Sequence, residues 1–254
     1  MTLRRERIVS ALADGETWTV NELAKKFDIT GITIRRDLAE LEREGKIVRT
    51  HGGAVIAKPS VVEFEFSERA QSRTREKRAI AQEAAKLIEP KMTVTIDTGT
   101  TTLEVAKALV GVEKLTVLTS SLAVASTLYR NGGVKLVLLG GIVRKDSPDM
   151  YGDVTVDNLR RFRVNLAILG ADAITEQGFF ALDPNVASVS RAMADQAIEK
   201  VVVADSSKFL AAAFARFAPW EEIDILVTDD EVPRSARRWL NTRAKRVIYV
   251  RARS

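Results

Sequence analysis

The amino-acid sequence predicts an α/β protein in which a small N-terminal winged helix-turn-helix precedes a mostly parallel, open sheet flanked by helices. In about the first 45 residues, three short helical patterns are followed by two β-prone runs around a Gly-Gly pair. From Arg75 onward, apolar strand-like runs alternate with helical segments, which is typical of a parallel sheet. The 254 residues exceed one average domain. We therefore expect two domains, over 1–57 and 75–254, joined by a linker over 58–74.

The composition argues against several classes of protein. Hydrophobic residues make up 46% of the chain, yet no apolar run reaches the ~18–20 residues that span a bilayer. The charged, periodic first residues do not resemble a signal peptide. There is no cysteine and a single histidine, His51, which argues against disulfides, thiol chemistry and a His/Cys zinc site. We expect a cytoplasmic protein with no membrane association, no bound metal and no cofactor.

Net charge is a weak guide to the partner of this protein. The formal charge of +5 permits nucleic-acid binding. From Met1 to His51, however, ten Lys and Arg stand against nine Asp and Glu, a net charge of only +1. From Pro233 to Ser254 there are eight Lys and Arg and no acid, a run typical of a solvated surface. An argument for DNA binding therefore rests on where the N-terminal charges lie.

The N-terminal helices can be assigned from apolar periodicity and from signals at their ends. A helical stripe of apolar residues predicts a first helix over 3–13. The run Thr19–Glu22 has the spacing of a capping box and predicts a second helix that ends at Phe27. Thr30 can cap a third helix that reaches about Glu44. The β-prone runs that follow predict a hairpin, or wing.

The third helix is the candidate DNA-reading element. Apolar residues at i, i+4 and i+7 form its buried face (Ile34, Leu38 and Leu41), which leaves the polar residues between them exposed. In a helix-turn-helix, the N-terminal residues of the second helix enter the major groove, where Arg can bond guanine or phosphate. On this pattern alone, a charged helical interaction module is an alternative. The candidate DNA contacts are Thr30, Thr33, Arg35 and Arg36, with Arg49 and His51 from the wing.

The end of the first strand of the second domain predicts an anion site. The run 98–102 reads Thr-Gly-Thr-Thr-Thr and directly follows a strand over 92–97. Gly99 lets the backbone approach a ligand, and threonine hydroxyls and free N–H groups at the start of the next helix suit a phosphate. The run is neither a P-loop nor a Rossmann fingerprint, because it lacks Gly-Lys-Ser/Thr and GxGxxG. An ordinary strand-to-helix turn is the alternative.

Polar residues also follow several other strand-like runs, which lie over 115–119, 135–139, 166–169, 201–204, 225–228 and 247–250. Ligands of open α/β sheets bind outside the C-terminal ends of the strands, so these clusters predict one crevice. Lysine and arginine there can hold a phosphate and carboxylates can accept sugar hydroxyls, although Asp and Ser also cap helices. The candidate effector residues are Asp97, Gly99, Thr100, Thr101, Thr102, Ser120, Gly141, Arg144, Asp172, Asp205 and Lys208.

The strings LRRERIVSAL, TVNELAKKFDIT and TIRRDLAELEREGKIVRTHGGA resemble the helix-turn-helix signature of the DeoR-type (deoxyribose-operon repressor) family. The strings IDTGTTTLEVAKAL, LLGGIVRKDSPDMYGD and VVVADSSKF resemble its sensor domain, so the resemblance covers about the whole chain. It implies DNA contacts at Thr33, Arg35 and Arg36, and a sensor similar in fold to ribose-5-phosphate isomerase and CoA-transferase domains. It also implies a sugar phosphate or related effector and a homo-oligomer, dimeric or tetrameric, on double-stranded operator DNA.

The chain departs from the family pattern in three places. Thr119-Ser120-Ser121 stands where the family has Thr-Asn-Ser, and Ala173-Ile174 where it has Gly-Ile. In a later helix the family's Glu-Ala-x-Val-Lys-Arg becomes Val186-Ala-Ser-Val-Ser190-Arg191. A lysine near a phosphate contributes a charge-assisted hydrogen bond. Its loss at Ser190 predicts a divergent ligand, larger or less charged, with Arg191 taking part of the lysine's role.

Three functions compete on these residues. The first is a repressor of carbohydrate-metabolism genes whose operator affinity changes with a small, phosphorylated, sugar-like metabolite, and it accounts for both domains. The second is a sugar-phosphate isomerase or transferase, but the second domain has no histidine and no nucleophile–base pair of convincing spacing. The third is a ligand-independent DNA binder, which leaves the runs 98–102 and 205–208 unused. We expect the first function and no enzymatic activity.

Overall fold

The computed structural model describes residues 3–12, 18–43, 47–50, 52–56, 61–145 and 147–252. The chain divides into two compact units, Met1–Val61 and Val62–Ser254, and each is described by itself. The predicted domain limits, at 57 and 75, lie on either side of this division. None of the described helices is long and apolar enough to cross a membrane.

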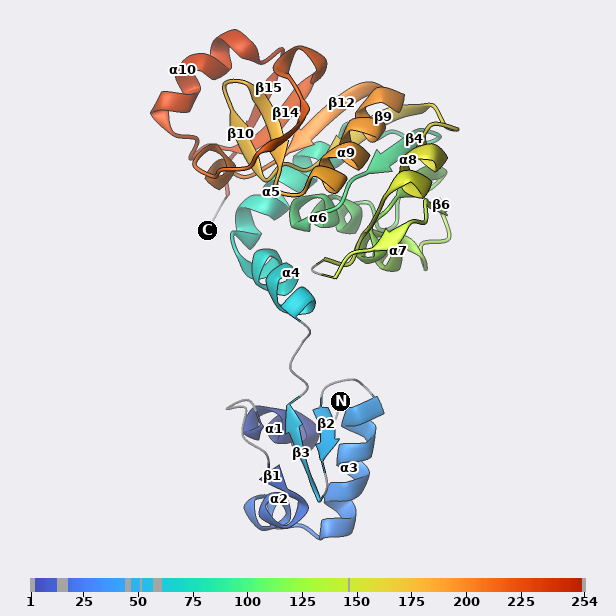
Figure 1. Cartoon of the computed structure of the whole chain (residues 1–254), viewed down its shortest axis with the longest axis vertical. Coiled ribbons are helices and arrows are strands. Elements are labelled where there is room, and N and C mark those ends of the chain that lie inside the picture. Colours follow the sequence, from blue (N-terminus) through green and yellow to red (C-terminus); the bar gives the residue numbers. More distant parts are fainter. Residues whose placement is uncertain are drawn as a thin grey trace. The chain divides into compact units, whose positions relative to one another are not determined.

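The first unit is a winged helix-turn-helix (Figure 1). Its helices are α1 (Leu3–Ala11), α2 (Val20–Phe27) and α3 (Gly31–Arg43). Over the described ranges, its strands pair antiparallel in the order β1-β3-β2, with β1 at Trp18–Thr19, β2 at Ile47–Thr50 and β3 at Gly53–Ile56. The sequence predicts the three helices and the β2–β3 hairpin, whereas the two residues of β1 are too few to leave a pattern.

The core of this unit is the apolar face that the helical periodicity predicts. Ile34, Leu38 and Leu41 of α3 are fully buried and pack with apolar residues of α1 and α2. Each such side chain contributes ~1.5–3 kcal/mol when it is buried. This packing holds α3 by one face and leaves the opposite face of the helix in solvent. The remaining buried members of the cluster are Ile8, Leu12, Val20, Leu23, Ile47 and Ala54.

The second unit is built on a parallel sheet of seven strands, counted within the residues that the structure describes. The strand order is β15-β14-β12-β9-β4-β5-β6. The order reverses between β4 and β9, which is the topological switch point where open α/β sheets bind ligands. Each strand overlaps one of the strand-like runs of the sequence. The strands are β4 (Thr93–Ile96), β5 (Leu115–Thr119), β6 (Val134–Leu138), β9 (Val164–Leu169), β12 (Ala197–Val203), β14 (Ile225–Asp229) and β15 (Val247–Val250).

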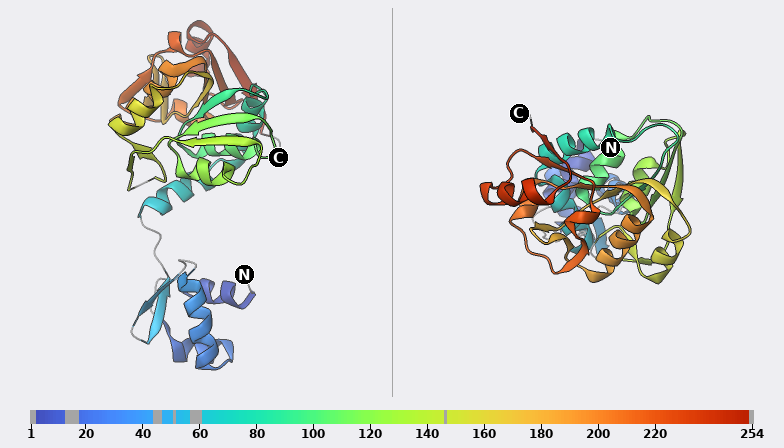
Figure 2. Two further views of the ribbon diagram at one scale, coloured as in Figure 1. Left: turned by 90° about the vertical axis from the view of Figure 1, so that its right-hand side faces the viewer. Right: turned by 90° about the horizontal axis from the view of Figure 1, so that it is seen from above.

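Helices cover both faces of this sheet (Figures 1 and 2). One face is covered by α5 (Thr74–Ala85), α6 (Thr100–Ala108) and α7 (Leu122–Leu128). The other is covered by α8 (Asp153–Leu159), α9 (Pro184–Gln196) and α10 (Arg234–Arg243). Successive residues of β9 from Leu166 to Leu169 alternate between the two cores. A strand that is buried on both faces is apolar throughout, which explains why these runs stand out in the sequence.

Smaller elements lie outside the main sheet. An antiparallel sheet is formed by β10, β11 and β13, and Phe179 of β11 packs on Trp220 with ring centroids 4.3 Å apart. The hairpin β7–β8 is also antiparallel. The bounds are β7 (Ile142–Val143), β8 (Met150–Tyr151), β10 (Ala173–Thr175), β11 (Gly178–Ala181) and β13 (Ala215–Ala218), with 3₁₀ helices η1 (Ser206–Phe209) and η2 (Trp220–Glu222).

Helix α4 (Val61–Gln71) occupies most of the segment that the sequence predicts to be a linker. Its Phe66 is buried in the same core as Ile80 and Ala84 of α5. Burial of an aromatic ring gives this segment a fixed partner in the second unit. Residues 61–71 of the predicted linker, whose local structure the sequence leaves open, are therefore helical. A helical stripe is weak here, which is why periodicity does not reveal the helix.

Candidate functional site

The turn between α2 and α3 follows from its local sequence. A reciprocal capping box starts α2: Thr19 Oγ1 accepts the N–H of Glu22 at 3.2 Å, and Glu22 Oε2 accepts the N–H of Thr19 at 2.7 Å. The helix ends at Asp28, whose φ of 53° is a left-handed conformation that Asp tolerates better than most residues. Thr30 Oγ1 then accepts the N–H of Thr33 at 3.3 Å and begins α3.

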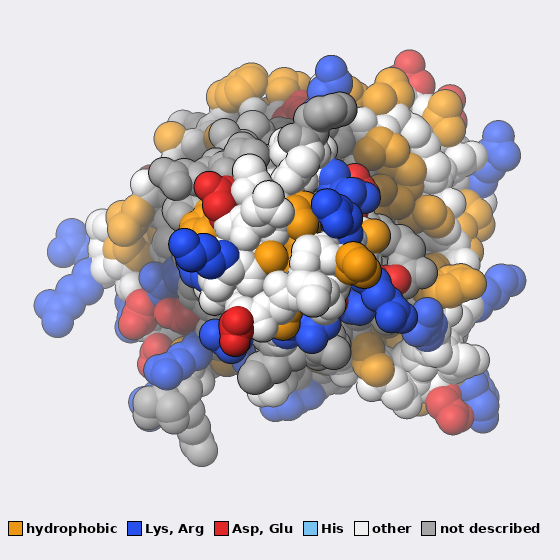
Figure 3. Space-filling view, turned by 90° about the horizontal axis from the view of Figure 1, so that it is seen from below, with side chains coloured by type: hydrophobic (Ala, Val, Ile, Leu, Met, Phe, Trp, Pro, Cys, Tyr) orange, Lys and Arg blue, Asp and Glu red, His pale blue; other side chains and the backbone are white. Residues whose placement is uncertain are grey.

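The polar side chains at the start of α3 are exposed. Arg35 and Arg36 extend into solvent and make no hydrogen bond or ion pair with another described residue. The hydroxyls of Thr30 and Thr33 lie 3.0 Å apart. Figure 3 shows this end of the first unit, where Lys and Arg side chains, with some Asp and Glu, lie around uncharged atoms. Exposed guanidinium groups without a protein partner are available to base edges or phosphates.

Ile32 is a candidate contact that the sequence analysis misses. Its side chain is 77% exposed on the first turn of α3. An apolar side chain at this position can contact the methyl group of a thymine. A signal for it exists, because Ile32 precedes the buried Ile34 by two residues and so lies about 200° round the helix from it.

Asp37 fixes α3 against α1. Its buried carboxylate accepts hydrogen bonds from Arg4 at 2.6 and 3.0 Å and from Arg5 at 3.3 Å. Burial by itself would raise the pKa of Asp37, but the two guanidinium groups outweigh it and hold this pKa below its ordinary value. The pairing sets the orientation of the helix that carries the candidate contacts. Sequence analysis does not single out Asp37, because an acid that follows two arginines normally faces solvent.

The wing presents one described candidate residue. Arg49 of β2 is exposed and pairs with Ala54 of β3. His51 lies outside the described residues. Gly53 lies against β1, where a Cβ atom would stand 2.2 Å from the carbonyl oxygen of Trp18. The wing is therefore anchored to β1 at a position that only glycine fits, and Arg49 stays a predicted contact.

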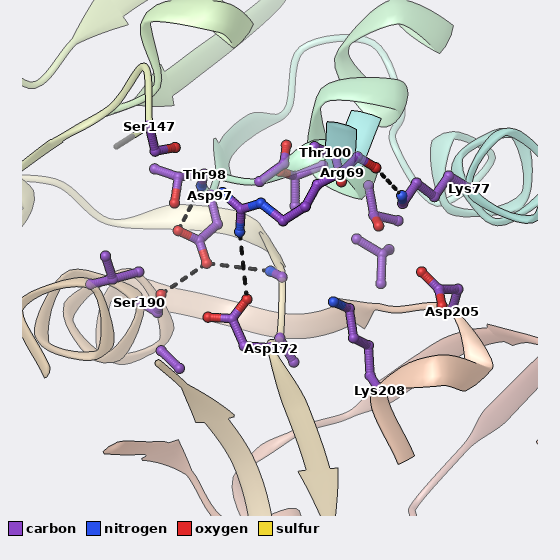
Figure 4. A pocket seen from close by; sticks show the side chains of 18 of the residues that line it. Arg69, Lys77, Asp97, Thr98, Thr100, Ser147, Asp172, Ser190, Asp205 and Lys208 are labelled. Carbon is purple, nitrogen blue, oxygen red and sulfur yellow. Dashed lines mark hydrogen bonds and ion pairs between the residues drawn. The ribbon is translucent and has the colours of Figure 1, made fainter. Parts of the chain in front are cut away.

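The second unit has a pocket at the switch point of its parallel sheet (Figure 4). Its cavity is about 130 Å³, and its walls come from the C-terminal ends of β4, β9 and β12 and from α4, α5, α6 and α9. The crevice expected from the strand ends thus exists as a single cavity. The predicted effector residues that line it are Asp97, Gly99, Thr100, Thr101, Thr102, Arg144, Asp172, Asp205 and Lys208.

Two predicted effector residues, Ser120 and Gly141, are not among those that line the pocket. Ser120 is fully buried, and its carbonyl oxygen accepts the N–H of Met150 in β8. At Gly141 a Cβ atom would stand 2.1 Å from Thr155 Oγ1. Both residues lie where the β7–β8 hairpin packs against the unit, so the structure gives them packing contacts in place of a position on the cavity.

The loop after β4 brings the start of α6 into the pocket. Gly99 is the N-cap residue of α6 with a φ of 124°, a conformation that side chains rarely adopt. Thr102 Oγ1 donates to the carbonyl oxygen of Gly99 at 3.1 Å, so the loop itself uses this hydroxyl. Thr100 is only partly buried on the pocket wall. Free N–H groups in the first turn of α6 make this wall suitable for an anion.

Asp97, at the end of β4, is enclosed and already occupied by protein donors. Its carboxylate accepts hydrogen bonds from the N–H of Thr98 at 2.7 Å, the N–H of Gly170 at 3.3 Å and the hydroxyl of Ser190 at 2.9 Å. These three hydrogen bonds lower the pKa of Asp97, but burial outweighs them and raises it to about 7. The geometry favours a structural joint between β4, β9 and α9 over the hydroxyl-binding role that the sequence suggests.

The carboxylates of Asp172 and Asp205 also have protein donors. Asp172 Oδ2 accepts the N–H of Leu182 at 2.9 Å. Asp205 is the N-cap residue of η1 and accepts the N–H of Ser207 at 3.1 Å. The alternative interpretation of these residues as caps therefore accounts for part of the polar pattern at the strand ends.

The cationic side chains of the pocket differ in how far they are engaged. The ammonium group of Lys77 is buried and donates to backbone carbonyls, and Arg73 Nε lies 3.3 Å from Asp205. The ammonium group of Lys208 has no hydrogen bond or ion pair with any residue in the described ranges. It is directed into the pocket (Figure 4). Lys208 is therefore the side chain best placed to take a ligand anion.

Sequence analysis misses the wall that α4 and α5 contribute. Four residues of this wall line the pocket, but they lie in or next to the predicted linker, where no motif marks them (Arg69, Ser72, Arg73 and Lys77). Val186 and Ser190, which depart from the family pattern, both line the cavity. Two positions at which this chain differs from the pattern thus lie where a ligand would meet them.

Family models and relatives match nearly the whole chain. The DeoR-like helix-turn-helix domain matches residues 4–60, and the DeoR C terminal sensor domain matches residues 72–230. The chain is 34% identical to the glycerol-3-phosphate regulon repressor of Haemophilus influenzae, over 97% of this chain and 96% of that protein. It is 35% identical to the transcriptional repressor AccR of Agrobacterium fabrum, over 89% of this chain and 88% of that one.

These relatives are transcriptional regulators and not enzymes, in agreement with the prediction of no enzymatic activity. Among solved structures, a ribose 5-phosphate isomerase A from Methanocaldococcus jannaschii is similar with a TM-score of 0.39 and 21% identity, over 52% of each chain.

Proposed function

We propose a function for this chain, which belongs to the DeoR family of transcriptional regulators. It represses carbohydrate-metabolism genes, and a small phosphorylated metabolite sets its affinity for operator DNA. One observation carries the proposal. A single chain combines an exposed helix of recognition type with a polar pocket at the switch point of the sensor sheet. A pure DNA binder has no use for the pocket, and an enzyme has no use for the helix.

The DNA contact in this proposal is made by the start of α3. Arg35 and Arg36 bond bases or phosphates, and Thr30 and Thr33 bond phosphate or a base edge, since these side chains are exposed or partly exposed. Arg49 and His51 of the wing reach the backbone or the minor groove. In a homo-oligomer, two copies of α3 fit half-sites about 34–36 Å apart, or a multiple of that spacing.

The effector site in this proposal uses Lys208, Arg69 and the start of α6. An ammonium group without a protein partner, a guanidinium group and free helix N–H groups are the donors that a phosphate prefers. The name of one relative refers to glycerol 3-phosphate, which supports a phosphate ester as the class of ligand. Ser190 stands in the pocket wall in place of the lysine of the family pattern, and Arg191 pairs with Glu222 and Asp195 and does not line the pocket. In this proposal Lys208, and not Arg191, therefore pairs with the anion.

The two sites are linked through the free energies of binding. An effector that binds better to one arrangement of the chain shifts the population toward it and changes DNA affinity by the same coupling free energy. For a repressor that is released by its effector, the favoured arrangement has the lower operator affinity.

The proposal is tested in two steps with the intact protein. Genomic fragments that it retains identify the operator, and a thermal-shift screen of sugars, polyols and their phosphate esters identifies the effector. A ligand at 100 times its dissociation constant adds ~2.7 kcal/mol to the stability of the folded state, which is a readable shift. The hit is then added to the complex with the selected DNA, and the fraction of bound DNA is measured.

We expect a phosphate ester to bind and to release the DNA. If the protein retains specific DNA but only unphosphorylated compounds bind, the phosphorylated effector is contradicted and the regulatory function still stands. Turnover of the hit would favour an enzyme, and absence of specific DNA retention would contradict the whole proposal. An increase in bound DNA on addition of the hit would make the protein an effector-activated DNA binder.

A further inference from the structure

Arg69 reaches the pocket from α4, the helix that follows the DNA-binding unit in the chain. Its Nη1 atom lies 3.9 Å from Asp172 Oδ1, at the outer limit of an ion pair. Its Nε atom is buried and has no hydrogen-bond partner within the described ranges. Figure 4 shows the side chain extending across the cavity. A buried donor without an acceptor is unfavourable, so Arg69 gains from any ligand oxygen that enters the pocket.

Arg69 can leave Asp172 without leaving that carboxylate unpaired. Asp172 Oδ2 already accepts the N–H of Leu182 at 2.9 Å. Lys208, from η1, is directed into the same cavity and has no partner among the described residues (Figure 4). An anion in the pocket therefore meets one cation from α4, Arg69, and one from η1, Lys208.

The C-terminal end of α4 is held by the first turns of α5. The buried ammonium group of Lys77 donates to the carbonyl oxygens of Arg69 and Ser72. Thr74 Oγ1 donates to the carbonyl oxygens of Ala70 and Gln71. Free carbonyls at a helix end normally allow fraying, and here side chains of α5 satisfy them. Burial lowers the pKa of Lys77, and the neighbouring cations Lys208 and Arg69 add to this, whereas the carboxylates of Asp205 and Glu76 act in the opposite direction.

The joint between α4 and α5 is anchored to the sensor at Arg73. This residue has a φ of 51°, a left-handed conformation, and separates the two helices. Its guanidinium group lies 2.7 Å from Glu231, 3.3 Å from Asp205 and 3.7 Å from Asp229. These acids follow or end β12 and β14, so the joint is fixed at the C-terminal edge of the sheet.

Arg69 lies two residues before the C-terminal end of α4, and Phe66, about one helical turn earlier, is buried in the same core as Ile80 and Ala84 of α5. A displacement of Arg69 is therefore passed along the helix and changes how Phe66 packs in that core.

We propose that Arg69 couples occupancy of the pocket to α4: an anionic ligand draws Arg69 from Asp172 toward Lys208, and the helix turns about the joint at Arg73. The inference rests on the proposed function, because it requires an anion in the pocket. The ligand binds more tightly when Arg69 contacts it, so binding increases the population of the corresponding position of α4. The residues that precede α4 in the chain move with the helix.

The test uses spin-label distances, for which the absence of cysteine in the chain is an advantage. Asn21→Cys on α2 and Ala108→Cys on α6 are exposed positions, one in each unit. Glycerol 3-phosphate and inorganic phosphate serve as anionic probes, and glycerol serves as the uncharged control. Calorimetric titration gives the dissociation constant of each probe, and distances are recorded without probe and at saturation.

In the doubly labelled parent we expect glycerol 3-phosphate to change the distance distribution by several ångströms, and glycerol to leave it unchanged. Arg69→Gln should weaken binding about tenfold and abolish the change even at saturation. Arg69→Lys should restore part of it. Arg75→Gln, an exposed arginine on α5 outside this pocket, is the matched control and should behave as the parent.

The outcomes separate the two proposals. A parent that binds the probe without a change in distance, or an Arg69→Gln variant that changes as the parent does at saturation, would overturn the role of Arg69 and leave the proposed function standing. If the parent binds neither phosphate probe, the phosphorylated effector of the proposed function is contradicted. The coupling through Arg69 is then contradicted too, because it requires an anion in the pocket.

Discussion

In the first unit, Arg35 and Arg36 are exposed and make no hydrogen bond or ion pair with another described residue. In the second unit, the carboxylate of Asp97 is enclosed and already accepts three hydrogen bonds. The two regions meet different physical demands. Water solvates an exposed guanidinium at little cost, so donors of a DNA-binding face can stay free until DNA arrives. A buried charge has no such solvent and must be satisfied by the protein itself.

This difference changes how candidate residues are interpreted. On the surface of α3, exposure and the lack of a partner are ordinary, and the position on the helix is the informative property. Inside the pocket, a polar residue with complete protein partners is explained by the fold, and a polar residue without them is the informative one. By that criterion Lys208 and Arg69 outrank Asp97, Asp172 and Asp205 as ligand contacts.

The largest expected effect concerns the two buried carboxyls, whose pKa values move in opposite directions. Burial raises the pKa of Asp97 from its ordinary 3.8 to about 7. Below pH 4 both the folded and the unfolded chain hold this proton. Between pH 4 and 7 the unfolded chain loses the proton first, so the free energy of unfolding falls by about 4 kcal/mol at pH 7 and changes little above it. The pKa of Asp37 is lowered in the folded protein, so its effect on stability has the opposite sign. Its contribution to the free energy of unfolding is lost as the pH falls through the pKa of the folded state.

Urea unfolding between pH 4.5 and 8 measures this contrast. Asp97→Asn removes the titrating group, so its stability should change less with pH than that of the parent over this range. Thr100→Val, a change in the same pocket that removes no titrating group, should follow the parent's pH dependence. Parallel curves for the parent and Asp97→Asn would show that Asp97 is ionised in the folded protein throughout this range.

The next effect concerns the exposed arginines of α3. Replacing Arg35 or Arg36 with alanine should weaken operator binding by ~1–3 kcal/mol each if they bond bases, without a change in the free energy of unfolding. If one of them bonds only phosphate, the loss of affinity should be similar for all DNA sequences. The slope of the logarithm of the binding constant against the logarithm of the salt concentration should then become less steep by about one. Arg130→Ala, an exposed arginine of the second unit, is the control. Unchanged binding in both variants would remove α3 from the DNA interface.

A smaller effect is expected at Lys208. Because its ammonium group has no partner among the described residues, Lys208→Gln should not alter stability, but it should weaken binding of a phosphate ester about tenfold, which is ~1.4 kcal/mol. Thermal shift and calorimetric titration with glycerol 3-phosphate measure the two quantities. Lys135→Gln on β6 is an exposed lysine outside the pocket and serves as the control. A loss of stability with unchanged ligand binding would assign Lys208 to the fold.

Much of the architecture was predictable because it depends on burial. The apolar stripe of Ile34, Leu38 and Leu41, and the run 166–169 that is buried on both faces, can be recognised in the sequence. The position of the pocket was predictable too, since polar strand ends in a parallel sheet share one edge. These are properties of local patterns repeated along the chain.

The roles within the pocket were not predictable, because they depend on partners far apart in the sequence. Nothing near Asp97 indicates that Ser190, 93 positions later, donates to it. Arg69 lies in a segment without periodicity and becomes a pocket residue only because the joint at Arg73 places α4 there. A strand end thus predicts where a polar group lies, while tertiary contacts decide whether it is free to bind.

The smallest expected effect tests whether the face of α3 reads sequence as well as charge. Ile32 is 77% exposed, so Ile32→Ala should leave the free energy of unfolding nearly unchanged. If its side chain contacts a thymine methyl, the variant should lose ~0.5–1 kcal/mol of affinity for the selected operator, at the ~0.8 kcal/mol expected for each buried methylene group, and nothing for unrelated DNA. Fluorescence anisotropy with both duplexes at matched salt measures this difference. Equal losses on both duplexes would mean that Ile32 acts through the geometry of the turn, and the specificity of this face would then rest on its arginines.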